Sequence, residues 1–253
     1  MDIKSSFGSV ITCLLALVVI FLAIHTEAAN EGAFEYLKLS LRWPISYCNT
    51  REIRRRGIHC NRPILRNFKI HGLWPMYTSD TPVPPFLENS GCTNTTPKMA
   101  DDIDRNLLHK IWRNMTENWP NVVYYHDNSA NLNFWKYEWE QHGMCFNNPD
   151  YPIHFFKTAL RLIRQHNLLQ ILEDAQIKPN NTKYHGYAIK DAITGVLGER
   201  PTIRCNKDSY GTVQLNEIWV CLHRNFTPRP CENIFSACPK AWVRPIMFTA
   251  PAV

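Results

Sequence analysis

The distribution of nine cysteines along 253 residues restricts the possible folds of this chain more than any other feature of its sequence. Cys13 stands apart from the others, because it lies in an apolar run over residues 10–24 that follows Lys4. The small residues of Thr26-Glu27-Ala28 come directly afterwards, and this order is typical of a secretory signal peptide. We therefore expect residues 1–28 to be removed and residues 29–253 to form a secreted, extracellular protein with eight cysteines.

The eight remaining cysteines are an even number, which in an exported chain predicts a disulfide framework. Their spacing alone leaves the pairing open. A zinc site is the alternative, but the sequence has no Cys-x-x-Cys pair and the intervals between its cysteines are irregular. We therefore favour disulfides and expect neither a metal nor another cofactor. We also expect no membrane association after removal of the signal, because no later run is apolar enough to span a bilayer.

The charge of the chain is basic, with 28 Lys and Arg against 22 Asp and Glu and a formal net charge of +6 at pH 7. Such a balance favours anionic partners such as RNA, DNA or a polyanionic wall, although many secreted proteins share it. The length of the mature chain suits one domain with a sizeable core.

Aromatic and aliphatic residues predict strands at residues 34–43 and 68–73, the second of them ended by Pro75. A long third strand is predicted at residues 213–222, with one break in its alternation near Asn216-Glu217. Strands and helices are mixed without a repeated βαβ order, so the predicted fold class is α+β.

Apolar residues at helical spacing predict helices over residues 101–118, 153–172 and 187–197. Two polar stretches, residues 49–62 and 78–96, are expected to be surface loops.

The segment FWKYEWEQHGMC, residues 134–145, places the carboxylate of Glu138 four residues before the imidazole of His142. In a helix that continues up to Gly143, these two side chains lie on the same face. A second imidazole, His71, stands far upstream in FKIHGLWP, within an apolar and aromatic frame. Two histidines and a carboxylate can move protons at a phosphodiester without a metal, because one imidazole takes a proton from the attacking hydroxyl and the other gives one to the leaving oxygen.

Each of these residues also has a simpler interpretation. A single histidine in an apolar strand is more often a hydrogen-bonded core residue, and a Glu and a His at helical spacing commonly form a surface pair. The remaining histidines of the mature chain lie outside such segments, and we interpret them as structural or solvated: His59, His109, His126, His154, His166, His185 and His223.

The two histidine-containing segments resemble the two active-site segments of the ribonuclease T2 family. The resemblance implies a single α+β domain with a central antiparallel sheet and several helices. It also implies a monomeric endoribonuclease that cleaves single-stranded RNA by 2′-OH transesterification through a 2′,3′-cyclic phosphate, without metal or cofactor. His142 would take the proton of the 2′-hydroxyl, His71 would protonate the departing 5′-oxygen, and Glu138 would assist at the phosphate. The implied disulfides are Cys48–Cys60, Cys92–Cys145, Cys205–Cys238 and Cys221–Cys231.

Four further side chains are candidates for contact with the substrate. Trp74 and Phe134 flank the catalytic segments, and the resemblance implies that their rings stack on bases, whereas the alternative is that both are core aromatics. Gln141 stands where the family usually has a lysine, so the site lacks one cation that would stabilise charge on the phosphate oxygens, and this predicts a reduced rate. Tyr137 stands where many members have a histidine, and Met144 replaces a usual threonine.

The basic charge and Tyr137 make the chain similar to the pistil self-incompatibility ribonucleases of plants, which implies a pollen partner of the F-box type. A ribonuclease of defence or phosphate salvage is one alternative. A catalytically weakened storage or recognition protein is another, and Gln141 is the residue that favours it. The sequons at Asn94, Asn114, Asn180 and Asn225 are predicted N-glycosylation sites.

Overall fold

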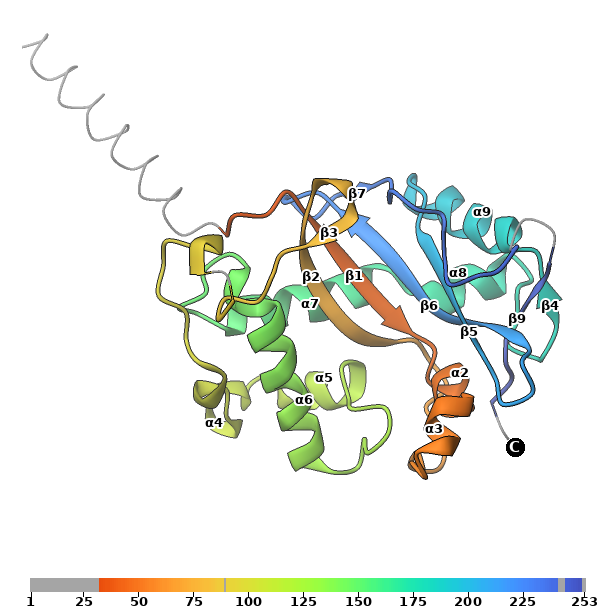
Figure 1. Ribbon diagram of the computed structural model, residues 1–253, viewed down its shortest axis with the longest axis horizontal. Helices are drawn as coiled ribbons and strands as arrows, with labels where there is room; N and C mark the ends of the chain where they lie inside the picture. Colours follow the sequence, from red (N-terminus) through yellow and green to blue (C-terminus); the bar gives the residue numbers. More distant parts are fainter. Residues whose placement is uncertain (1–31, 89, 241–243, 252–253) are drawn as a thin grey trace, which may run out of the picture.

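An antiparallel sheet carries the fold, with strand β1 (Tyr36–Arg42) at its centre (Figure 1). The computed structural model describes residues 32–88, 90–240 and 244–251, so the predicted signal peptide lies outside the described residues. β1 pairs antiparallel with β2 (Lys69–Tyr77) on one side and with β6 (Val213–Leu222) on the other, and β5 (Thr202–Lys207) pairs antiparallel with β6. Shorter strands extend the sheet: β3 (Thr81–Pro82), β4 (Lys183–Tyr184), β7 (Pro228–Arg229), β8 (Phe235–Ser236) and β9 (Ile246–Met247).

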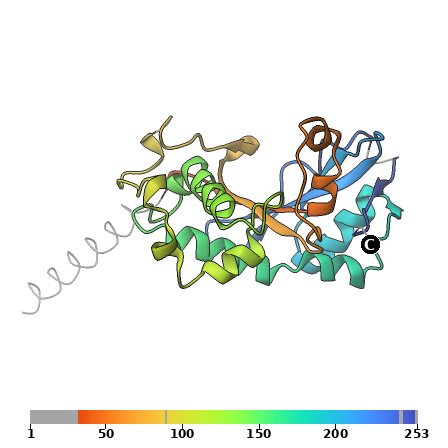
Figure 2. The same ribbon diagram turned by 90° about the horizontal axis from the view of Figure 1, so that it is seen from below.

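The helices lie on both sides of this sheet. They are α2 (Pro44–Cys48), α3 (Arg51–Arg55), α4 (Arg105–Leu108), α5 (Trp112–Asn118), α6 (Asn128–Gln141), α7 (Ile153–Gln165), α8 (Leu168–Asp174) and α9 (Gly186–Leu197). Figure 2 shows α7 and α8 along one side of the strands, and α6 and α3 on the other side. The prediction of an α+β fold with a central antiparallel sheet and several helices is confirmed.

Alternation along β1 gives the sheet one apolar and one polar face. Leu37, Leu39 and Leu41 are fully buried in the core that also contains Phe155 and Phe156 of α7. Successive side chains of a strand point to opposite faces, so Lys38, Ser40 and Arg42 line the face turned away from α7. This polar face lies between α6 and α3, and it carries the candidate site.

The predicted break in β6 is confirmed, and it has a structural cause. Arg204 of β5 lies opposite Glu217, whereas Cys205, the next residue, lies opposite Leu215. Asn216 is therefore an extra residue, a β-bulge that changes which face the following side chains occupy. In the resulting register Glu217 lies opposite Arg42 of β1.

Two predicted helices are each divided in the structure. The prediction for residues 101–118 is wrong at its start, where Asp104 accepts from the backbone N–H of Leu107 and begins α4, and again after Leu108, where α4 ends before α5 begins at Trp112. The prediction for residues 153–172 is wrong at Asn167, whose side chain accepts from the N–H of Gln170 and begins α8. Asp and Asn side chains cap a new helix more readily than they continue an old one.

Two boundaries also differ from the sequence prediction. Pro75 does not end the second strand, because β2 continues to Tyr77 with Pro75 opposite Leu37. A proline is tolerated there because only the two residues of β3 pair with the outer side of β2, near the edge of the sheet. The predicted loop at residues 49–62 contains α3, which Thr50 begins by accepting from the N–H of Ile53.

Four disulfides fasten the loops to the sheet: Cys48–Cys60, Cys92–Cys145, Cys205–Cys238 and Cys221–Cys231. They are the pairs that the resemblance implied. Cys92–Cys145 joins the segment before α4 to the end of the α6 region, and Cys48–Cys60 closes the segment that contains α3. Within the described ranges, no helix is both long and apolar enough to cross a bilayer.

Candidate active site

Helix α6 positions the carboxylate and one imidazole of the predicted site. Asp127 caps the helix by accepting from the N–H groups of Ser129 and Ala130, and the helix ends at Gln141. His142 is the residue that follows the last helical turn, and its N–H donates to the carbonyl of Glu138 at 3.1 Å. The prediction of a helix up to Gly143 is wrong by two residues, because His142 has left the helical conformation, but the four-residue spacing still joins His142 to Glu138 through the last turn.

Strand β2 positions the second imidazole opposite α6. The indole N–H of Trp119 donates to the carbonyl of His71 at 3.1 Å, and the indole N–H of Trp135 of α6 donates to the carbonyl of Trp119 at 2.5 Å. Trp119 and Trp135 are fully buried. This pair of hydrogen bonds connects α6 to β2 beside His71.

The ring of Trp74 contacts both histidines. Its centroid is 5.3 Å from that of His71, nearly perpendicular at 82°, and 5.6 Å from that of His142. Trp219 of β6 contacts Trp74 from a third side at 5.7 Å. The structure therefore brings together His71, Trp74, His142 and Glu138, which are separated by up to 71 residues in the sequence.

Gly72 makes room for this arrangement. A Cβ atom at residue 72 would lie under 3.0 Å from both the indole nitrogen of Trp74 and Oε2 of Glu138. Any other residue would displace one of these two side chains. The glycine between His71 and the tryptophan is thus required by close approach of the catalytic groups.

Three buried polar atoms of the site make no well-formed hydrogen bond among the described residues, although the Trp74 indole N–H is close enough to the Glu138 carboxyl to lower its pKa. The three atoms are Nε1 of Trp74, Oε2 of Glu138 and Nδ1 of His142. A buried polar atom without a partner costs free energy, so such atoms are rare in folded proteins. Three of them at one place indicate a site that a polar ligand completes.

Glu217 is the centre of a second group of polar side chains next to His71. Its carboxylate is fully buried, and it accepts from five donors on four strands: Ser40 Oγ at 3.2 Å, Arg42 Nε at 2.9 Å, His71 Nδ1 at 3.0 Å, Arg204 Nη1 at 3.1 Å and Trp219 Nε1 at 3.0 Å. Five donors are enough to hold a carboxylate ionised in the interior. Glu217 therefore fixes the orientation of the His71 ring.

Arg42 places a positive charge in contact with His71. Its Nη2 lies 2.9 Å from Nδ1 and 2.8 Å from Nε2 of His71, and its guanidinium covers the ring of Tyr47 at 4.3 Å. Two lysines near the catalytic segments are held elsewhere. Lys69 donates to the carbonyl of Glu117, and Lys136 pairs with Asp101 at 3.2 Å.

Burial and charge shift the pKa of each candidate catalytic group. Burial, and to a lesser extent the charge of His71, lower the pKa of His142 to about 3. Burial and then Arg42 lower the pKa of His71 below its ordinary value of 6.5, against an opposing effect of Glu217. Burial raises the pKa of Glu138 to about 8, although the charge of Arg42 opposes this. Three groups at one place thus have displaced pKa values, which is typical of a functional site.

Glu217 is ionised despite its position. Burial opposes the charge, but the neighbouring charges of His71 and Arg42 hold the pKa of its carboxyl well below the usual range.

The family assignment follows from comparison with known proteins. The sequence model of the ribonuclease T2 family matches residues 34–231, which include both histidine segments. The chain belongs to the ribonuclease T2 family. Three T2 relatives are the intracellular ribonuclease LX of Solanum lycopersicum, ribonuclease S-F11 of Nicotiana alata and a ribonuclease-like storage protein of Panax ginseng. Ribonuclease LX is 33% identical over 84% of this chain and 79% of its own length. Ribonuclease S-F11 is 32% identical over 82% of this chain and 93% of its own length. The storage protein is 26% identical over 85% of this chain and 83% of its own length.

Solved T2 structures share the fold. The self-incompatibility associated SF11-RNase of Nicotiana alata matches 85% of this chain and 99% of its own, with a TM-score of 0.67 and 28% identity. RNase NT in complex with 5′-AMP matches 85% of this chain and 98% of its own, with a TM-score of 0.64 and 27% identity.

The residues that depart from the T2 pattern lie in different surroundings. Met144 is fully buried in the core, away from solvent. Gln141 is half-buried in the last turn of α6, and Tyr137, one turn earlier, is 58% exposed. Phe134 is half-buried and lines a cavity of about 180 Å³ together with Arg42. The structure thus presents Phe134 beside the site, and leaves Tyr137 on the outer surface of α6.

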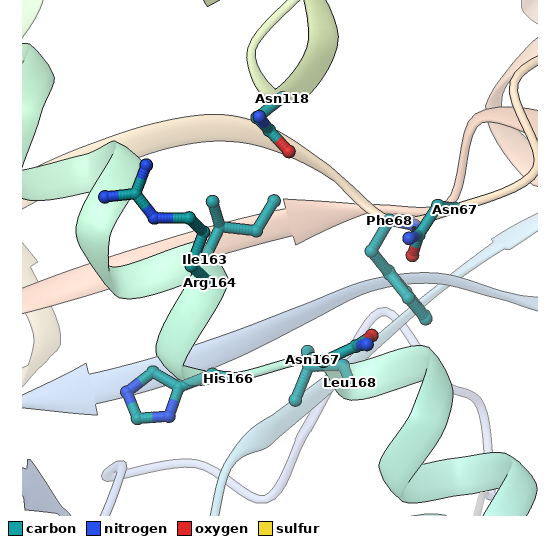
Figure 3. A pocket seen from close by; sticks show the side chains of 8 residues that line it. All are labelled: Asn67, Phe68, Asn118, Ile163, Arg164, His166, Asn167 and Leu168. Carbon is teal, nitrogen blue, oxygen red and sulfur yellow. Dashed lines mark hydrogen bonds between the residues drawn. The ribbon is translucent and has the colours of Figure 1, made fainter. Parts of the chain in front are cut away.

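Another cavity, of about 250 Å³, lies away from the T2 site, between the start of β2, the end of α5 and the junction of α7 and α8 (Figure 3). It is lined by Asn67, Phe68, Asn118, Ile163, Arg164, His166, Asn167 and Leu168. None of the sequence-predicted site residues belongs to it. His166 is buried there, and both its ring nitrogens lack a hydrogen-bond partner among the described residues.

Sequence reasoning missed four residues of the T2 site: Arg42, Arg204, Glu217 and Trp219. The polar alternation of Lys38, Ser40 and Arg42 between leucines was a signal that one face of β1 serves a site. The break in alternation at Asn216-Glu217 was a signal that β6 also contributes to the site. Nothing local indicated that these two strands lie next to each other.

The predicted glycosylation sites differ in accessibility. Asn94, Asn180 and Asn225 are exposed, whereas Asn114 is half-buried on α5. Among the described residues, no group of three or more His, Cys, Asp or Glu side chains is arranged to hold a metal ion.

Proposed function

We propose that this T2 protein is a secreted endoribonuclease that cleaves single-stranded RNA through a 2′,3′-cyclic phosphate. The observation that carries the proposal is that one side chain, Trp74, contacts both imidazoles, His71 and His142, next to the carboxyl group of Glu138. Two oriented imidazoles provide one base and one acid for a single proton-coupled displacement. RNA supplies its own nucleophile, the 2′-hydroxyl next to the scissile phosphate.

In the first step His142 removes the proton of the 2′-hydroxyl. The bond between O2′ and phosphorus forms, the bond between phosphorus and O5′ breaks, and His71 gives a proton to O5′. The lowered pKa of His142 keeps this imidazole neutral and able to accept a proton at any pH well above 3. His71 must be protonated for its role. Burial and Arg42 lower its pKa, and the ion pair with Glu217 opposes them by stabilising the protonated form.

Glu138 acts as a hydrogen-bond donor in this proposal. Its pKa of about 8 keeps the carboxyl group protonated at neutral and acidic pH. A protonated carboxyl can donate to a non-bridging phosphate oxygen, whereas an ionised one would repel it. The unpartnered Oε2 atom is the atom that would make this contact.

Arg42 supplies the positive charge that Gln141 lacks. We expect Arg42→Gln to raise the activation free energy by about 1 to 1.5 kcal/mol, because a neutral donor replaces a charged one. This corresponds to a kcat that is roughly five- to tenfold lower. Gln141→Lys should then restore more activity in the Arg42→Gln background than it adds to the wild-type protein. Steady-state kinetics on a dinucleotide measure both effects, with Lys136→Gln as the matched control for loss of one cation near α6. If Gln141→Lys alone raises kcat tenfold, Arg42 does not fill this role.

The rate of RNA cleavage is expected to be highest at acidic pH. On the alkaline side kcat/KM should fall as pH rises through the pKa of His71, which lies below 6.5, because the acid loses its proton. On the acidic side it should fall only as pH approaches about 3, where His142 becomes protonated. A pH–rate profile on a dinucleotide checks this. Arg42→Gln should shift the alkaline limb to higher pH, because loss of the Arg42 charge raises the pKa of His71. A maximum above pH 8 would be inconsistent with these roles.

The substrate class is tested with RNA and DNA of one sequence in the presence of a chelator. RNA should be cut and DNA left intact, because DNA lacks the 2′-hydroxyl. Loss of RNA cleavage on chelation, or equal cutting of single-stranded DNA, would refute the proposal.

Secretion, N-glycosylation and a role in pistil self-incompatibility are the finer parts of the proposal. The similarity to ribonuclease S-F11 and to the SF11-RNase structure supports self-incompatibility, with a pollen protein of the F-box type as the partner. Ribonuclease LX, named as intracellular, and the storage protein of Panax ginseng support other roles. Expression confined to the pistil would favour self-incompatibility, and an inactive purified protein would favour storage or recognition.

A further inference from the structure

A further cavity lies next to the polar side chains around Glu217 and shares residues with them. This cavity has a volume of about 450 Å³, and Arg42, Arg204 and Glu217, which surround His71, also form part of its wall. Its opposite wall is built from α3 and the end of β5, which contribute Arg51, Arg56 and Lys207 among others. We call it the basic cavity.

Two links hold the walls of the basic cavity together. The Cys48–Cys60 disulfide closes the segment that contains α3. An isolated antiparallel bridge between Thr50 and Asp208 joins the start of α3 to the end of β5. Arg51 and Lys207 are next in sequence to the two bridged residues, and both line the cavity.

The positive charge of the basic cavity is not balanced within it. Only two acidic residues line it, and both are already paired: Glu217 by five donors, and Glu52 by Arg55 at 2.7 Å and Arg56 at 2.5 Å. Arg51 and Lys207 are exposed and have no ion pair among the described residues. Two exposed cations that line one cavity attract an anion.

We infer that the basic cavity binds a phosphodiester of the RNA strand on the 3′ side of the scissile bond. The direction rests on the proposed function: His71 protonates the departing O5′, so the strand that leaves is the one next to His71. Arg42 contacts His71 and also lines the cavity, so the 3′ strand passes Arg42 and reaches Arg51 and Lys207. Asn206, Asn216 and the ring of Tyr47 offer further contacts to sugar and base. Because Arg42 both lines the cavity and contacts His71, the cavity fits an elongated polyanionic substrate better than an acidic protein.

The test uses chimeric oligonucleotides in which a single ribonucleotide within deoxynucleotides fixes the scissile bond. One substrate is a dinucleotide, one carries three more nucleotides on the 3′ side, and one carries three more on the 5′ side. The variants are Arg51→Gln/Lys207→Gln and a control of equal charge, Lys157→Gln/Arg164→Gln, on α7 across the sheet. The readout is the ratio of kcat/KM between each extended substrate and the dinucleotide.

In the wild type and the α7 control, the 3′ extension should raise kcat/KM roughly three- to tenfold, as expected for two exposed ionic contacts. In Arg51→Gln/Lys207→Gln this gain should fall below about twofold, whereas the ratio for the 5′ extension should not change. The 3′ gain should also weaken with salt, with a log–log slope of about −0.7 for each phosphate contacted.

Three results would overturn the inference: a 3′ gain retained in Arg51→Gln/Lys207→Gln, an equal loss in the α7 control, or a loss confined to the 5′ extension. Retention would leave the basic cavity to an acidic protein partner. If the wild type cleaves no substrate, the proposed function fails, and the inference is decided by the affinity for uncleavable 2′-O-methyl pentanucleotide. That affinity should drop at least threefold in Arg51→Gln/Lys207→Gln and stay unchanged in the α7 control, and equal affinities would overturn the inference.

Discussion

Replacement of either catalytic histidine by alanine should nearly abolish RNA cleavage. A positioned acid or base typically contributes about 10²- to 10⁴-fold, so we expect at least this loss from His71→Ala and from His142→Ala. The two losses should not multiply in the double variant, because both imidazoles serve the same proton-coupled step. The measurement is kcat on a dinucleotide, monitored by the release of the cyclic phosphate.

The matched control for these variants is His223→Ala, which removes an exposed histidine outside the site. Circular dichroism and the thermal midpoint establish that each variant is folded. A folded His71→Ala or His142→Ala protein that retains near wild-type turnover would refute the assignment of these residues.

The second large effect is expected on stability, from Glu217→Ala. Removal of one partner from a buried charge group typically costs about 3–5 kcal/mol, because the remaining charges are left uncompensated. Here the alanine would leave the guanidinium groups of Arg42 and Arg204 without their shared carboxylate. The free energy of unfolding, from urea titration with the disulfides intact, measures the loss.

Glu117→Ala is the control, because Glu117 forms an exposed ion pair with Arg113 at 2.8 Å on α5. Exposed pairs contribute about 0–1 kcal/mol, so this variant should unfold close to the wild type. Glu217→Gln keeps the shape of the side chain and one acceptor oxygen. Its free energy of unfolding should therefore lie between those of Glu217→Ala and Glu117→Ala. If Glu217→Ala costs no more than Glu117→Ala, the carboxylate does not hold the site together.

The sequence was sufficient for one side of the site and insufficient for the other. Glu138 and His142 are neighbours in sequence, so helical spacing alone places them together. His71 joined them only through the resemblance of its segment to a known one. Arg42 and Glu217 lie 175 residues apart and meet because β1 and β6 are adjacent in the sheet, which no local pattern encodes.

The same distinction explains the errors in the helices. Apolar periodicity identified the buried faces of residues 101–118 and 153–172, and these faces are indeed in the core. It did not identify where Asp104 and Asn167 begin new helices, because capping depends on a side chain turning back to the backbone. The proline in β2 was misjudged for a related reason, since its acceptance depends on how few residues pair with the outer side of that strand.

The most direct test of the central claim is the chemical identity of the first product from a dinucleoside monophosphate. Phosphorus NMR during the reaction, in the presence of a chelator, distinguishes a cyclic phosphate from an open phosphate end. Two imidazoles acting on the 2′-hydroxyl predict that a 2′,3′-cyclic phosphate and a free 5′-hydroxyl appear first and together. Direct formation of a 5′-phosphate, or no cleavage by a folded protein, would contradict the account.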